Sequence, residues 1–217
     1  WCYMRIISAK EKGRAEKRKL LNLPEYTLTE EIINAVTHGI GALLGLVAVI
    51  LLILYVPENP VKQITSLIYA GSMVLLYLVS CLYHALPVGR PKKIFQVLDH
   101  CTVYILIAGT YTPISLISIG GAQGSFLTAF VWGVALCAIF LNVIDMQRFR
   151  VLSMVFYIAL GWCALFFLRP LVSGLDPESL FFLILGGVLY TVGAVIYGLG
   201  RTHRYMHSLW HIFCLLG

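Results

Sequence analysis

The chain has 217 residues, of which 59% are hydrophobic and only 12% are charged, and its formal net charge is +6. Its mean hydropathy of +0.87 and its long uncharged apolar stretches exclude an ordinary soluble domain and predict an integral membrane protein. These stretches are apolar on all sides instead of alternating, so a membrane β-barrel is disfavoured and the predicted fold is all-α.

Residues 1–29 are predicted to form a basic cytoplasmic arm. Seven positive residues lie in it: Arg5, Lys10, Lys12, Arg14, Lys17, Arg18 and Lys19. Such residues are attracted to anionic headgroups by about 1 kcal/mol each near the surface. We therefore expect membrane lipids as partners and no nucleic acid.

Residues 30–217 are predicted to form a seven-helix transmembrane domain. Its apolar segments are Ile32–Val56, Ile64–Leu86, Phe95–Ile119, Gly124–Ile144, Val151–Val172, Ser179–Gly200 and Tyr205 to the end. Pro113 and Pro170 fall inside segments, where neighbouring helices can tolerate a kink. The last segment is shorter than the roughly 20 residues needed to span a bilayer, so we expect the sequence to stop within its last helix.

Positive charge sets the expected orientation. With the amino terminus inside, fourteen of the 16 Lys and Arg residues fall on the cytoplasmic side, and only Lys62 and Arg169 fall outside. This asymmetry predicts a cytoplasmic amino terminus and a carboxyl terminus on the outside.

Several polar side chains stand inside the apolar segments, where an ionisable group costs at least about 2.5 kcal/mol at the bilayer centre. In the predicted orientation they share a layer within about two turns of the cytoplasmic face. They are Glu31, Asn34, His38, His84, Asp99, His100, Asp145, His207 and His211. An ionisable residue within a span indicates a functional site by default.

His207 and His211 stand four residues apart, which stacks both imidazoles on one helix face and makes them a candidate metal chelate. Interfacial histidines wetted by headgroups are the alternative. His84 precedes a short Pro-containing loop, so it and Asp99 are expected to be antiparallel neighbours at matching depth. If the last helix closes against this pair, three imidazoles and one open position would describe a catalytic zinc site.

The remaining polar groups then acquire expected roles. Asp99 could hold or deprotonate a water at the metal, or could instead cap the third helix. Ser80, one turn from His84, could hydrogen-bond to that water or to an oxyanion. Glu31, Asn34 and His38 share one face of the first helix and are expected to support the site as a polar or packing network, with His38 as the first substitute for His84.

Five motifs follow one another along the chain: Glu31-x-x-Asn34-x-x-Thr37-His38, Ser80-x-x-x-His84, Leu98-Asp99-His100, Ala108-Gly109-Thr110-Tyr111-Thr112-Pro113 and His207-x-x-x-His211. Together they resemble the hemolysin III family, the bacterial branch of the progestin and adipoQ receptors, which include the adiponectin receptors. The resemblance covers the chain from Thr29 onward and implies a bacterial plasma membrane as its location.

The resemblance implies a seven-helix bundle with one Zn²⁺ in its inner-leaflet half. By position His84, His207 and His211 match the zinc ligands, Asp99 matches the acid that contacts zinc through water, and Ser80 matches the serine near that water. The wider superfamily includes alkaline ceramidases, so hydrolysis of a lipid amide or ester that enters from the inner leaflet is the implied chemistry.

Two other functions stay open. Zinc could be structural, in a receptor or sensor that catalyses nothing, or the protein could be cytolytic, as the family name suggests. A retinal-binding pump is excluded, because no lysine follows Lys93 to form a Schiff base on the last helix.

Overall fold

The computed structural model describes residues 13–56, 59–199 and 203–217, and the regular structure in these ranges is all helical. Residues 1–12 of the predicted arm, together with Gly200 and Arg201, lie outside the described residues. Within the described residues, six helical units are long and apolar enough to cross a membrane. They are α2 (Leu28–Tyr55), α3 (Pro60–Ala85), α4 (Arg90–Pro113) with a π-helical extension (Ile114–Ile119), α5 (Gly121–Asp145), the broken unit of α6 (Arg150–Trp162) and α7 (Leu168–Gly174), and α8 (Pro177–Leu199).

The predicted apolar segments correspond one by one to these units, and the last corresponds to the short helix α9 (Met206–Leu216). The all-helical prediction is confirmed for the described residues. With 11 residues α9 is too short to count as a span, so the structure supports six membrane-length helices and leaves the seventh as a prediction.

Local capping explains why the helices begin before the apolar runs. Thr27 and Glu30 form a capping box at the start of α2. The Asn59 side chain accepts from the backbone N–H of Lys62 at the start of α3. In α4, Pro91 occupies the first turn, where its missing N–H costs nothing, so the helix begins at Arg90 and not at the predicted Phe95.

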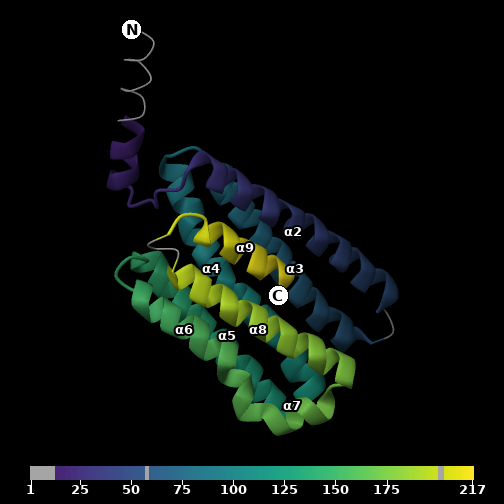
Figure 1. Ribbon diagram of the computed structural model, residues 1–217. Helices are drawn as coiled ribbons and strands as arrows, with labels where there is room; N and C mark the ends of the chain where they lie inside the picture. The colour runs from purple at the N-terminus through teal and green to yellow at the C-terminus, as the bar shows by residue number, and fades with distance from the viewer. Residues whose placement is uncertain (1–12, 57–58, 200–202) are drawn as a thin grey trace, which may run out of the picture.

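The helices pack in chain order from α2 to α5, and α9 lies against both α8 and α2 (Figure 1). Two glycines let α2 approach α3 closely. A Cβ at Gly41 would come within 2.9 Å of the Tyr77 ring, and one at Gly45 within 2.9 Å of the Val74 side chain. The register between α2 and α3 is therefore fixed by close contact, and this register places the polar face of α2 opposite the end of α3.

The main buried cluster lies between α4, α5 and the α6 region, and a smaller one lies between α2, α3 and α4. Many large apolar side chains on the outer faces are exposed, for example Leu43 on α2 and Phe140 on α5. An apolar exterior of this kind suits lipid as the surrounding solvent.

The predicted segment Val151–Val172 is broken by a 3₁₀ stretch, Cys163–Phe167, just before Pro170. Proline lacks an N–H and its ring clashes with the carbonyl four residues earlier, so the regular helix cannot continue through this point. Tyr111 of α4 satisfies the freed backbone: its hydroxyl donates to the Leu160 carbonyl at 2.8 Å and accepts from the Ala164 N–H at 3.0 Å.

Candidate metal centre

Three histidines from two helices converge at one end of the bundle. His84 lies near the end of α3, and His207 and His211 lie on α9. One potential ligand atom of each lies within 4.8 Å of the others, and the Nε2 atoms of His207 and His211 are 3.1 Å apart. All three are buried, His207 being the most accessible at 8%. The structure thus brings together the three residues that the sequence analysis selected.

The donor set fits a metal ion. Nε2 of His84 is buried and has no hydrogen-bond partner among the described residues. A buried polar atom without a partner is costly, by about 1–3 kcal/mol, and a metal ion satisfies a nitrogen lone pair. Tetrahedral zinc with bonds of about 2.0–2.1 Å requires nitrogens roughly 3.3 Å apart, close to the spacing within the α9 pair. Three imidazoles suit zinc, copper, iron or nickel, so the geometry alone does not choose the metal.

Ser80 lies four residues before His84 on α3, and Asp99 lies on the following helix, α4. Ser80 is 1% exposed and its Oγ has no hydrogen-bond partner among the described residues. Asp99 is 9% exposed and lies more than two turns inside α4, because that helix already begins at Arg90. The alternative that Asp99 caps its helix is therefore wrong, since capping acts within the first turn.

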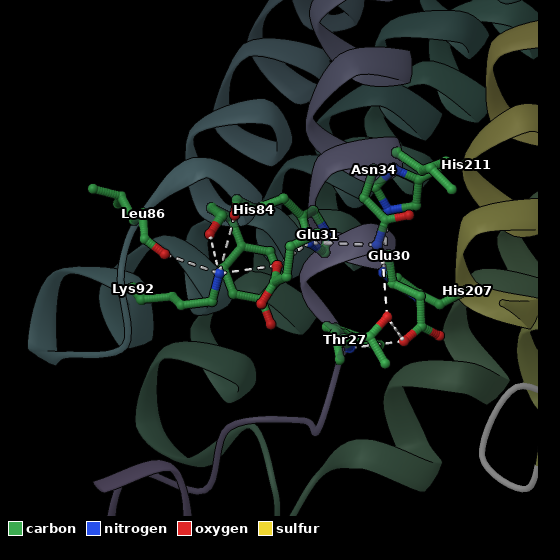
Figure 2. A network of polar contacts seen from close by, with 12 residues as sticks. Thr27, Glu30, Glu31, Asn34, His84, Leu86, Lys92, His207 and His211 are labelled. Carbon is green, nitrogen blue, oxygen red and sulfur yellow. Dashed lines mark hydrogen bonds and ion pairs between the residues drawn. The ribbon is translucent and has the colours of Figure 1, made fainter. Parts of the chain in front are cut away.

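The expected supporting network on α2 contacts the histidines directly (Figure 2). Glu31 Oε2 lies 2.8 Å from Nδ1 of His84, and Asn34 Nδ2 lies 3.5 Å from the same nitrogen. The His38 ring stacks on His211, with centroids 3.7 Å apart and planes at 22°. His38 is not a member of the converging group, so it is not needed as a substitute for His84.

Lys92 entered the sequence analysis only as one of the fourteen positive residues assigned to the cytoplasmic side, yet it is 3% exposed and lies beside the site. Its Nζ donates to Glu31 at 3.0 Å and to the Tyr83 and Leu86 carbonyls at 2.8 and 3.1 Å (Figure 2). Arg18 approaches the other oxygen of Glu31 at 3.4 Å. In the sequence Lys92 is only one of several positive residues near a short loop, and this pattern does not reveal that its side chain is buried.

Tyr26 was not selected from the sequence at all. Its ring stacks on His207, with centroids 4.8 Å apart and planes at 18°, and it lies 5.7 Å from the His84 ring. The Arg18 guanidinium holds the Tyr26 carbonyl at 2.9 Å. Burial raises the pKa of the Tyr26 phenol well above its ordinary value, and neighbouring Tyr83 acts in the same direction. The end of the predicted arm is thus packed against the site.

Glu30 joins α9 to α2. One carboxylate oxygen, Oε2, accepts from the backbone N–H and the hydroxyl of Thr27, each at 2.8 Å. The other, Oε1, accepts from the backbone N–H of Tyr205 at 2.8 Å. Tyr205 has a φ of 63°, an unusual conformation outside glycine, and it immediately precedes the helix that carries His207 and His211. Adjacent glutamates on α2 therefore act on two sides of the site: Glu30 binds the residue that precedes α9, and Glu31 contacts the His84 ring.

Together these features define a multi-pass, all-helical membrane protein with a buried three-histidine cluster that could hold a metal ion. A sequence model described as "Haemolysin-III related" matches residues 26–217. The chain belongs to this haemolysin III-related family, which confirms the resemblance noted in the sequence.

Individual relatives agree with the family match. The chain is 39% identical over 201 residues to the protein named Hemolysin-3 of Bacillus cereus, covering 92% of this chain and 91% of the relative. It is 38% identical over 194 residues to the Hemolysin-3 homolog of Bacillus subtilis (strain 168), covering 88% and 91%. It is 24% identical over 159 residues to the human Monocyte to macrophage differentiation factor, covering 70% and 65%.

Proposed function

We propose that this protein is a zinc-dependent hydrolase of lipid amide or ester bonds, with zinc held by His84, His207 and His211. The observation that carries the proposal is the convergence of three buried imidazoles, of which His84 has an unpartnered Nε2. Zinc in a three-histidine site with an open position polarises a carbonyl and lowers the pKa of a water.

The neighbouring polar side chains supply the other functions that hydrolysis needs. The Asp99 carboxylate would accept a proton from the attacking water and return it to the leaving group. The Ser80 hydroxyl would donate a hydrogen bond to the carbonyl oxygen of the substrate. Burial of both residues supports these roles, because a hydrogen bond or a charge acts more strongly where water is excluded.

We further propose the arrangement in the membrane: seven helices counting α9, a cytoplasmic amino terminus, and a site in the inner-leaflet half of a bacterial plasma membrane. The distribution of Lys and Arg supports this orientation. The two basic residues beside the site, Arg18 and Lys92, belong to the side assigned to the cytoplasm. A lipid substrate would then enter sideways from the inner leaflet.

A second candidate is a receptor or sensor in which zinc only ties α3 to α9. The packing of Tyr26 on His207 and of His38 on His211 favours it, since rings that cover the ligands restrict access to the metal. Cytolysis, which the names of the two Bacillus relatives suggest, is a third candidate, and leakage of dye from liposomes that contain the protein tests it directly.

The test compares variants of the purified full chain for zinc content and for cleavage of a ceramide-type amide and a fatty-acyl ester. We expect His84→Ala to lose zinc and turnover together, and Asp99→Asn to keep zinc and lose turnover. Glu178→Gln, an exposed carboxylate on α8, is the control. Turnover that persists without metal refutes the hydrolase, whereas zinc binding with no turnover in any lipid favours the structural role.

A further inference from the structure

The contact between Glu31 and His84 is the closest polar contact made by any triad ring in the described part of the chain. Glu31 Oε2 lies 2.8 Å from His84 Nδ1, and the side chains are 8% and 0% exposed. A contact this short between buried groups from two helices fixes the rotation of the imidazole as well as its position. The His84 ring therefore has one defined orientation relative to α2.

The chemistry of the contact also fixes the tautomer. An ionised carboxylate only accepts hydrogen bonds, so Nδ1 of His84 must carry the proton and donate it to Glu31. In the neutral ring the lone pair then stands on Nε2, which is the buried nitrogen without a hydrogen-bond partner among the described residues. The nitrogen that can bind a metal is thus the one that converges with α9.

Glu31 is itself held in place from two sides. Lys92 Nζ donates to Oε2 at 3.0 Å, and Arg18 Nη2 approaches Oε1 at 3.4 Å. Lys92 is anchored in turn on the Tyr83 carbonyl and on the His84 carbonyl, at 2.8 and 3.3 Å. Two cations thus lie against the two oxygens of the buried carboxylate and fix the position of the group that contacts His84. Figure 2 shows Lys92, Glu31 and His84 joined in this way.

We propose that Glu31 is the positioning residue for His84: it orients the ring, selects its Nδ1–H tautomer and so raises its affinity for the metal. The inference rests on the proposed function in one respect, that the triad holds a metal. Carboxylates that accept from a metal-binding histidine commonly change metal affinity about 10- to 100-fold when removed. Glu31 acts through the His84 ring, so it is a positioning residue and not a catalytic one.

The experiment measures Zn²⁺ and Co²⁺ affinity by competition with a chelator, on the full chain in detergent. We expect Glu31→Gln, whose amide oxygen still accepts, to weaken binding about 10-fold, and Glu31→Ala to weaken it up to about 100-fold. We also expect the Co²⁺ absorption spectrum of Glu31→Ala to change, because the His84 ring is then free to turn, and that of Glu31→Gln to change less, because its amide oxygen still accepts. Glu25→Gln, an exposed glutamate on the segment before α2, should match the unchanged protein in both measurements.

Unfolding of the metal-free variants separates positioning from a purely structural role. If Glu31→Gln lowers metal-free stability but leaves affinity and the Co²⁺ spectrum unchanged, the inference is overturned and the proposed zinc site stands. If the unchanged protein binds neither ion, the proposed function fails first. Should Glu31→Ala not fold, Glu31→Gln alone decides, because its side chain keeps the size and the acceptor of glutamate.

Discussion

Comparing Glu30→Ala with Thr27→Ala gives a quantitative test of how the Glu30 carboxylate docks α9. Thr27→Ala removes the half of the capping box in which the threonine hydroxyl accepts from the Glu30 N–H, which costs about 1 kcal/mol. Glu30→Ala removes the other half, in which the carboxylate accepts from the Thr27 N–H, and also removes the acceptor for the Tyr205 N–H. A hydrogen bond to a charged group contributes about 1.5–3 kcal/mol. Glu30→Ala should therefore be less stable than Thr27→Ala by roughly that amount.

The metal affinity should follow the stability, because α9 carries two of the three candidate ligands. If α9 is docked in a smaller fraction of molecules, the apparent dissociation constant rises in inverse proportion to that fraction. The assay is chemical unfolding of metal-free protein in micelles, followed by chelator competition for both variants. Equal stability and equal affinity for Glu30→Ala and Thr27→Ala would refute the claim that this carboxylate docks α9.

Three further outcomes are expected. Tyr26→Ala should destabilise the protein by about 0.5–1.5 kcal/mol through lost ring stacking and should speed metal exchange, while Tyr26→Phe should do neither. Equal rates of metal exchange in the two variants would contradict this. Gly193→Ala should cost about 1–3 kcal/mol in thermal unfolding, because its Cβ would come 2.8 Å from Trp210, whereas Gly187→Ala on the same helix meets nothing within 4 Å and should cost nothing. Starting from free zinc at 100 times its dissociation constant, removal of zinc by a chelator should lower the unfolding free energy of the unchanged protein by about 2.7 kcal/mol. The same treatment should leave the unfolding free energy of His211→Ala unchanged.

Much of the site could be predicted because its signals are local. The four-residue spacing of His207 and His211 places both rings on one face of any helix. The short loop after His84 requires α3 and α4 to be antiparallel neighbours, so His84 and Asp99 had to lie at one end of the bundle. These inferences need only helix geometry and chain connectivity.

The contacts that hold the site could not be predicted, because they depend on packing between distant segments. Glu31 meets His84 because glycines on α2 allow close approach to α3 in one register. Lys92 is buried because its long side chain turns back onto the carbonyls that end α3. Tyr26 reaches His207 through the irregular path of the chain before α2, for which an apolar pattern carries no signal.

The predicted helix starts differ from those in the structure for another reason. Apolar runs mark where a helix is surrounded by lipid, whereas caps and first-turn prolines mark where it begins. The start of α4 at Arg90 moved Asp99 into the helix interior and removed its alternative as a cap. The break before Pro170 was foreseeable as a kink, but its repair by the Tyr111 hydroxyl was not.

The most direct test of the metal centre is X-ray absorption at the zinc edge, together with zinc content, on the full chain purified from zinc-replete cells. The predicted result is about one zinc per chain with three imidazole nitrogens at about 2.0–2.1 Å, and loss of that zinc in His84→Ala. A stable protein that purifies without metal, or zinc bound through sulfur at about 2.3 Å, would contradict the account.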